Sequence, residues 1–168
     1  GEEAGSVSDT AYTFTGLTAN TVYTAGIRAF CGEGDTSVMR TIEFRTACEG
    51  GTCTFSVVMS DSYGDGWSGN AVDVYSAGSL FASATIAGNS SSATETFSPC
   101  LGDSVVLVWQ SGLYAYETSF SIVNAADSTV LNVNGGDQCT TGDTLVVFDG
   151  QCAATAVFVP DTCETPTD

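Results

Sequence analysis

The sequence contains no lysine and no histidine, and only three arginines stand against 20 acidic residues. The formal net charge of -17 repels nucleic acids and anionic membrane surfaces, so neither is expected as a partner. The acidity favours solubility in a saline or calcium-rich medium over a specific cationic partner. Without histidine or lysine, the usual general bases and activated nucleophiles are missing, and we expect a protein that is not an enzyme.

Long apolar runs are also missing, since no stretch approaches the ~20 residues that cross a membrane. The first residues lack the charged and apolar segments of a signal peptide. The seven cysteines show no C-x-x-C spacing and have no histidine to complete a zinc site. Disulfides are the better interpretation, and they indicate an oxidising compartment. We predict a secreted or cell-surface protein whose targeting sequence lies outside this segment.

The first 47 residues contain a strand pattern with one buried face, because apolar residues alternate with period two at Tyr23, Ala25, Ile27 and Ala29. A loop at 31–37 and a second strand at 41–46 follow. The run from Tyr23 to Gly32, closed by Phe44-Arg45-Thr46, resembles strands E to G of a fibronectin type III domain in large bacterial and algal surface proteins. The resemblance implies an immunoglobulin-like sandwich in which the hydroxyl of Tyr23 bonds to the backbone a few residues upstream.

A complete domain of this type needs roughly 90–100 residues, so residues 1–47 supply only its C-terminal part. Half a sandwich exposes its inner face, and we expect other copies or neighbouring domains of the same protein to complete it. Residues 153–168 read as a connector, and the stretch 161–168 resembles the lead-in to another type III domain. The chain is therefore expected to begin inside one such domain and to end at the threshold of the next.

Residues 48–152 form a second all-β domain, of β-sandwich or jelly-roll type. Short strands are separated by turn signals such as Gly88-Asn89 and Gly135-Gly136, and no helical period is present. The run Val105–Trp109 is apolar on both faces and is predicted to be a central strand. The predicted strands cover residues 53–60, 71–76, 80–86, 94–98, 103–110, 118–124, 129–133 and 144–148.

The loop Asp61–Asn70, with the sequence DSYGDGWSGN, concentrates unusual chemistry between two strands. Asp61 and Asp65 repel each other in a tight loop unless a cation lies between them. Glycines allow carbonyl oxygens to turn inward, Asn70 can add an amide oxygen, and Asp73 is a reserve ligand. The spacing is not that of an EF-hand, yet oxygen ligands favour calcium. The alternative is a metal-free corner in which Tyr63 and Trp67 plug the core and the aspartates cap turns.

This loop resembles the DSYGDGW signature of a module found in secreted and cell-surface proteins of marine bacteria and algae. The resemblance covers roughly residues 53 to 150 and extends to the stretches 109–112 and 116–122. It implies that Glu117 is a distant ligand of the same cation. It implies no enzymatic activity.

The cysteines within the second domain are expected to pair at strand ends, as Cys53–Cys100 and Cys139–Cys152. By the type III resemblance, Cys31 pairs with a cysteine at the position that Cys163 holds for the next domain. Cys48 is then unassigned, with Cys48–Cys53 as an alternative. Connectivity does not follow from sequence alone, so these pairings stay open.

With catalysis set aside, the functional prediction rests on the cysteines, the acidic loop and the family resemblances. We expect a non-catalytic, extracellular structural or adhesive module of a repetitive surface stalk or filament, stabilised by disulfides and calcium. The alternative is a carbohydrate-binding accessory module of a secreted hydrolase. Separately, Asn89 begins a glycosylation sequon and is a possible site of glycosylation. Five aromatic residues could form a sugar-stacking surface, which are Tyr63, Trp67, Trp109, Tyr114 and Tyr116. Packing is the favoured interpretation, and Trp109, in an apolar strand, is predicted to be core.

Overall fold

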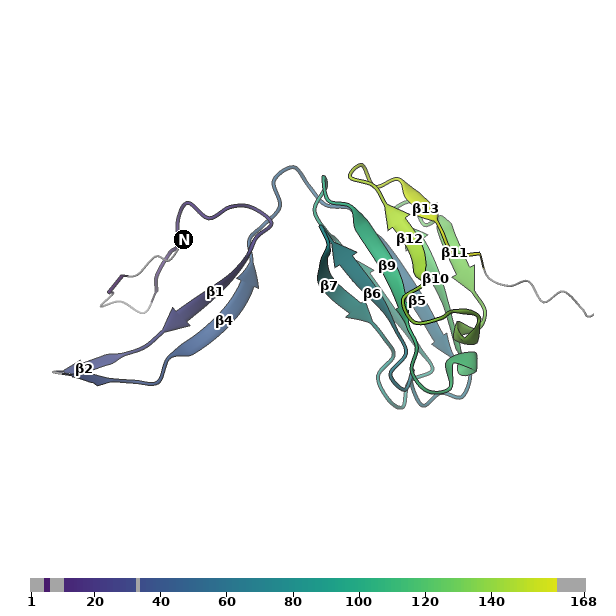
Figure 1. The fold of residues 1–168 in the computed structure, drawn as a ribbon, viewed down its shortest axis with the longest axis horizontal. Helices are drawn as coiled ribbons and strands as arrows, with labels where there is room; N and C mark the ends of the chain where they lie inside the picture. The colour runs from purple at the N-terminus through teal and green to yellow at the C-terminus, as the bar shows by residue number, and fades with distance from the viewer. Residues whose placement is uncertain (1–4, 7–10, 33, 160–168) are drawn as a thin grey trace, which may run out of the picture. The chain divides into compact units, whose positions relative to one another are not determined.

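The computed structural model describes residues 5–6, 11–32 and 34–159. The chain divides into two compact units, Gly1–Glu49 and Gly50–Asp168. Both are all-β, and the only helical segments among the described residues are two short 3₁₀ turns (Figure 1). No helix in this part of the chain has the length and apolar character needed to cross a membrane. The division lies two residues beyond the boundary that the sequence predicted.

The strands of the first unit form a long antiparallel hairpin. Strand β1 (Val22–Ile27) pairs with β4 (Arg40–Arg45), as predicted. The predicted loop between them is instead a narrow ribbon of β2 (Phe30–Gly32) and β3 (Asp35–Thr36), which continues the same hairpin.

One face of this hairpin carries apolar side chains from both strands. Tyr23 lies opposite Phe44, and Ala25 lies opposite Ile42. The side chains of Ile27 and Ile42 are 69% and 67% exposed. The backbone amide of Thr18 donates to the hydroxyl oxygen of Tyr23 at 3.0 Å, which is the backbone contact that the type III resemblance implies.

The second unit is a sandwich of two antiparallel sheets. The four-stranded sheet has the order β11-β10-β5-β8, and the five-stranded sheet has the order β13-β12-β9-β6-β7. All eight predicted strands are present, and β9 is central in its sheet as predicted. The strands are β5 (Phe55–Asp61), β6 (Ala71–Ser76), β7 (Ser79–Ala84), β8 (Ser92–Phe97), β9 (Val105–Gln110), β10 (Thr118–Asn124), β11 (Thr129–Val133), β12 (Thr144–Phe148) and β13 (Ala154–Ala156).

The core lies between the two sheets and is built by alternate residues of each strand. Aromatic rings cross it at two levels. Phe55 stacks on Phe148 with ring centroids 4.7 Å apart, and Trp109 stacks on Phe120 at 5.2 Å. Each pair joins one sheet to the other, so the aromatic residues fix how the sheets face each other.

Strand β13 was not predicted, because the sequence assigned residues from 153 onward to a connector. It follows a tight turn in which one carboxylate oxygen of Asp149 accepts from the backbone amides of Gln151 and Ala153. The turn returns the chain antiparallel to β12, so the sandwich continues to residue 156. The later part of the predicted connector, residues 160–168, lies outside the described residues.

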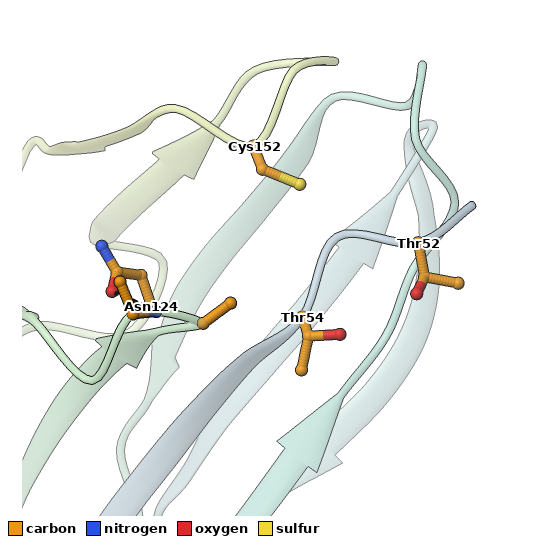
Figure 2. Close-up of a pocket in the computed structure, with 6 residues that line it drawn as sticks. Thr52, Thr54, Asn124 and Cys152 are labelled. Atoms are coloured by element: carbon orange, nitrogen blue, oxygen red, sulfur yellow. Dashed lines mark hydrogen bonds between the residues drawn. The ribbon is translucent and has the colours of Figure 1, made fainter. Parts of the chain in front are cut away.

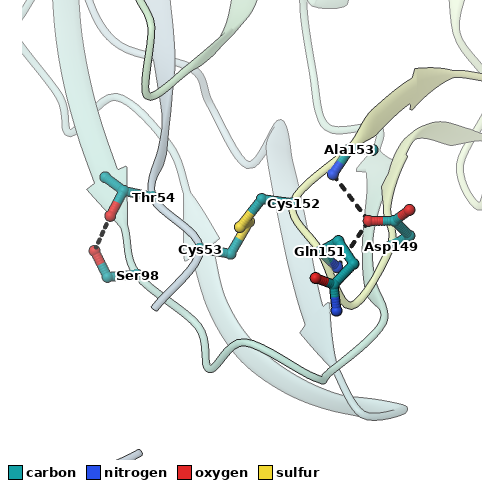
Figure 3. Close-up of a disulfide and its surroundings, with 7 residues drawn as sticks. All are labelled: Cys53, Thr54, Ser98, Asp149, Gln151, Cys152 and Ala153. Carbon is teal, nitrogen blue, oxygen red and sulfur yellow. Dashed lines mark hydrogen bonds between the residues drawn. A yellow bond between two sulfur atoms is a disulfide. The ribbon is translucent and has the colours of Figure 1, made fainter. Parts of the chain in front are cut away.

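The disulfide pairing differs from both predicted pairs. Cys53 is bonded to Cys152, so Cys53–Cys100, Cys139–Cys152 and the alternative Cys48–Cys53 are wrong (Figure 3). Cys48 and Cys100 are each disulfide-bonded as well. The disulfides indicate folding in an oxidising environment.

The physical reason for the error is the direction in which Cys53 points. Just before β5, the backbone of residues 52 and 53 pairs with the segment that follows β8. The amide of Cys53 donates to the carbonyl of Pro99 at 2.7 Å, and Thr52 pairs with Cys100. The Cys53 side chain is 2% exposed and belongs to the core. The turn between β12 and β13 brings Cys152 to it from the facing sheet, so the bond joins two sheets rather than two neighbouring strands.

Two described cysteines remain thiols. Cys31 is exposed and Cys139 is buried. Burial raises the pKa of the Cys139 thiol to about 12, with smaller contributions from the charges of Asp143 and Asp137. Cys139 is therefore protonated and unreactive at neutral pH. The predicted partner position for Cys31, Cys163, lies outside the described residues.

Candidate metal centre

Four loops meet at one end of the sandwich, and each crosses from one sheet to the other (Figure 1). They join β5 to β6, β7 to β8, β9 to β10 and β11 to β12, and they cover residues 62–70, 85–91, 111–117 and 134–143. The Cys53–Cys152 bond lies at the opposite end, where β5 begins. The predicted loop thus sits where segments distant in sequence come together.

Trp67 anchors the predicted loop in the core. Its side chain is fully buried, and its ring Nε1–H donates to the carbonyl of Ser60 at 3.0 Å. It packs edge-on against Trp109 and Phe120. Since Trp67 and Trp109 are both 0% exposed, neither belongs to a sugar-stacking surface. Tyr63 does not plug the core, because it is 77% exposed.

Asn70 fastens the loop to its neighbour between β9 and β10. Its side-chain NH₂ donates to the carbonyls of Trp67 and Leu113 at 2.6 and 2.7 Å, and its Oδ1 accepts from the amide of Gly112 at 2.7 Å. The residue is fully buried. The predicted ligand oxygen of Asn70 is therefore engaged in holding two loops together.

Three carboxylates come together beside this junction. Asp61, Asp65 and Glu117 each offer an oxygen, and these oxygens lie within 4.8 Å of one another. Strand register explains the approach, since Asp61 at the end of β5 faces Thr118 at the start of β10. The amide of Ser62 also donates to the carbonyl of Glu117 at 2.9 Å. Glu117 precedes β10 in the 3₁₀ turn η1 (Ala115–Glu117), which adjoins the second such turn, η2 (Gly136–Gln138).

Asp61 is the buried member of the three, with 4% of its surface exposed. Its Oδ2 accepts from the backbone amides of Gly64 and Gly66 at 2.8 and 2.9 Å, so it caps the turn as the metal-free alternative predicted. Its Oδ1 is also buried and has no hydrogen-bond partner among the described residues. A buried carboxylate oxygen without a partner is costly and calls for a compensating group.

No side chain of the second unit can supply that compensation as a positive charge. All three arginines precede residue 46, and the chain has no lysine or histidine. Three carboxylates in close approach therefore need a cation from solution if all are ionised. The electrostatics of this end of the sandwich fit a bound metal ion.

Carboxylate oxygens are ligands that calcium takes in proteins. Calcium binds only oxygen in proteins, at 2.3–2.6 Å, so oxygens on opposite sides of one ion lie about 4.6–5.2 Å apart. The 4.8 Å span of the three carboxylates fits within that sphere. Of the predicted ligands, Asp61, Asp65 and Glu117 are brought together. The reserve ligand Asp73 accepts instead from the hydroxyl of Ser83 at 2.6 Å, on the β6–β7 pair.

A hollow of about 320 Å³ opens beside the carboxylates and is lined by Tyr63, Asp65, Tyr114 and Glu117. Tyr114 and Tyr116 are 54% and 63% exposed and pack edge-on at 6.3 Å. Partial desolvation, the charge of Glu117 and a hydrogen bond to its carboxylate raise the pKa of Tyr116, so the phenol stays protonated at neutral pH. The tyrosines of the predicted aromatic set therefore surround the acidic group, while the tryptophans are core.

A second hollow, of about 260 Å³, lies at the disulfide end (Figure 2). It is lined in part by Thr52, Thr54, Asn124 and Cys152. The Oδ1 of Asn124 accepts from the backbone amides of Ala126 and Ser128, and Cys152 is in the disulfide. Asn124 and Cys152 are thus engaged in contacts within the fold, and we assign no ligand to this hollow.

The glycosylation sequon lies in the loop between β7 and β8. Asn89 is exposed, and its backbone amide donates to the carbonyl of Asp65 at 3.1 Å. Its side chain is therefore accessible while its backbone supports the loop that carries the metal candidates.

Gly66 provides a direct test of how tightly this loop is packed. Its φ is +95°, and a Cβ there would lie 2.7 Å from the carbonyl oxygen of Ala87. We expect Gly66→Ala to lower the free energy of unfolding by about 2–3 kcal/mol, because left-handed strain and a backbone clash add together. Gly78→Ala is the matched control, with φ +77° and nothing within 4 Å of the added atom. Gly78→Ala is expected to lower the free energy of unfolding by only about 1–2 kcal/mol. Urea denaturation measures both variants. Equal losses in the two variants would contradict the packing described here.

The chain was compared with protein-family models, with curated proteins and with solved structures, and no match was found in any of the three. The two family resemblances therefore stay interpretations of the sequence. The proposal below rests on the geometry of the loop end.

Proposed function

We propose that this chain is a non-catalytic, extracellular structural or adhesive module whose sandwich is held by disulfides and by a bound calcium ion. The observation that carries the proposal is the partnerless, buried Oδ1 of Asp61 in a group with Asp65 and Glu117. A calcium ion there would bind residues of both the β5–β6 and the β9–β10 loops. Its positive charge would balance the three carboxylates, since the second unit has no basic side chain to do so.

The non-catalytic character is supported by the same chemistry. The chain has no histidine or lysine to act as a base, and its buried free thiol stays protonated. The three carboxylates share one small volume, which suits joint coordination of an ion. The disulfides support a secreted or cell-surface location.

The first unit supports the idea of a repetitive stalk or filament. Its hairpin has the corner contact between Thr18 and Tyr23, and it exposes the apolar side chains of Ile27 and Ile42. We propose that strands from neighbouring domains or other copies of the same protein cover this face, as in a complete fibronectin type III sandwich.

Calcium removal is the test of the proposed metal centre. A ligand at 100 times its Kd stabilises the folded state by about 2.7 kcal/mol, which raises Tm by roughly 5–10 °C in a chain of this size. We therefore expect calorimetry of the full chain to show a Tm several degrees higher in calcium than in EDTA.

Variants locate the effect. Asp61→Asn and Glu117→Gln should each abolish the calcium-dependent shift, whereas Asp127→Asn should keep it. Asp127 is an exposed aspartate in the β10–β11 turn with φ +57°, a conformation that asparagine also tolerates. A Tm that is the same in calcium and in EDTA would refute the metal centre.

A further inference from the structure

The hollow beside the carboxylates has features that a purely structural metal site does not need. Asp65 and Glu117 belong both to the metal triad and to the lining of the hollow, so an ion held by the triad can be reached from it. The hollow measures about 320 Å³, at the lower end of the range for small-molecule sites.

The other two lining residues are tyrosines with exposed rings. Tyr63 is 77% exposed and Tyr114 is 54% exposed. Tyr114 also adopts the left-handed conformation, with φ 55° and ψ 38°, where glycine or asparagine is less strained. Neither core packing nor backbone preference accounts for a tyrosine at this position. Strained residues of this kind concentrate at binding sites.

The coordination sphere has room for a ligand. Calcium takes six to eight oxygens, and three carboxylates that each give one oxygen leave at least three positions for backbone carbonyls, water or a bound molecule. Neutral ligand oxygens are favoured over anionic ones, because the chain carries a net charge of -17 and no basic side chain after residue 45.

We propose that this hollow binds a neutral glycan through the metal ion. Two adjacent sugar hydroxyls coordinate the ion held by Asp61, Asp65 and Glu117, and the C–H groups of the sugar ring pack on both Tyr63 and Tyr114. The inference rests on the metal centre proposed above, and it gives the adhesive module a ligand class. Anionic glycans are disfavoured by the charge of the chain.

The test uses the full chain on an array of neutral glycans, in calcium and in EDTA, followed by calorimetric titration with mannose, fucose and galactose. These sugars differ in the geometry of their adjacent hydroxyls. We expect binding in calcium and its complete loss in EDTA.

Variants separate ligand binding from metal binding. Tyr63→Ala and Tyr114→Ala should each weaken sugar binding by about tenfold, as truncation of an aromatic contact residue commonly does, while the calcium-dependent Tm shift stays unchanged. Leu80→Ala is the control, because Leu80 on β7 is 55% exposed and does not line the hollow. It should change neither quantity.

The outcomes distinguish the two proposals. A calcium-dependent Tm shift with no sugar bound in any form would overturn the glycan site and leave the metal centre standing. Absence of both the shift and sugar binding would overturn both. Sugar binding that survives EDTA or both tyrosine variants would place the glycan elsewhere and also overturn this inference.

Discussion

Replacing Cys53 and Cys152 together by alanine is expected to lower the free energy of unfolding by about 4–5 kcal/mol. The bond closes a loop with a sequence separation of 99, and the loss of chain entropy on closing a loop of this length is worth roughly that amount. The measurement is chemical denaturation of the full chain without reductant.

The control for this experiment is Cys31→Ser, which alters an exposed free thiol and should change the free energy of unfolding by less than about 0.5 kcal/mol. A double variant as stable as the parent would mean that the two sheets do not depend on this bond. The Cys53–Cys152 bond would then not be a main source of stability at this end of the sandwich.

Asn70→Asp is expected to cost at least about 3 kcal/mol, and calcium should not restore the loss. The substitution keeps the shape of the side chain and replaces its NH₂ group by an oxygen. That oxygen would face the carbonyls of Trp67 and Leu113, which now accept hydrogen bonds at 2.6 and 2.7 Å in a fully buried site. Buried acceptors left without donors, beside a new buried charge, account for the expected magnitude.

The same substitution separates the two roles considered for Asn70. A metal ligand changed from amide to carboxylate would retain or strengthen calcium binding, so a stable Asn70→Asp variant with tighter calcium binding would contradict the structural role. Asn132→Asp is the matched control. Asn132 is exposed and its side chain makes exposed hydrogen bonds to Ser121 and Asn134, so the change should have little effect on unfolding.

The fold was predictable where side chains alternate. The period-two pattern of β5 and the apolar run of β9 follow from burying one face or both faces of a strand, and this local signal needs no knowledge of the partner sheet. Strand β13 was missed because three residues are too short to show a period. Its presence depends on the turn that Asp149 holds.

The candidate site was predictable only in part. Asp61 and Asp65 stand out because a single loop contains both, and Glu117 was added through a family resemblance. The strand register between β5 and β10 gives Glu117 a physical reason to be there. The role of Asn70 could not be foreseen, because its partners Gly112 and Leu113 lie more than 40 residues away in sequence.

The disulfide and the aromatic residues were unpredictable for a shared reason. Cys152 meets Cys53 across the sandwich, and Trp67 is buried while Tyr63 is exposed although they are four residues apart. Each of these outcomes depends on how one sheet lies over the other. Sequence patterns report the face of a strand, and they do not report what packs against that face.

The position of the Cys53–Cys152 bond decides how the second unit responds to a pulling force. Strands β5 to β12 all lie inside the covalent loop, and tension that enters before Cys53 passes directly through the two sulfur atoms to Cys152. The enclosed segment cannot be drawn out, although its extended length would be roughly 330–360 Å. Among the described strands of the second unit, β13 alone follows the loop, so a stretched chain can give up this short strand while the bond keeps β5 to β12 from being extended.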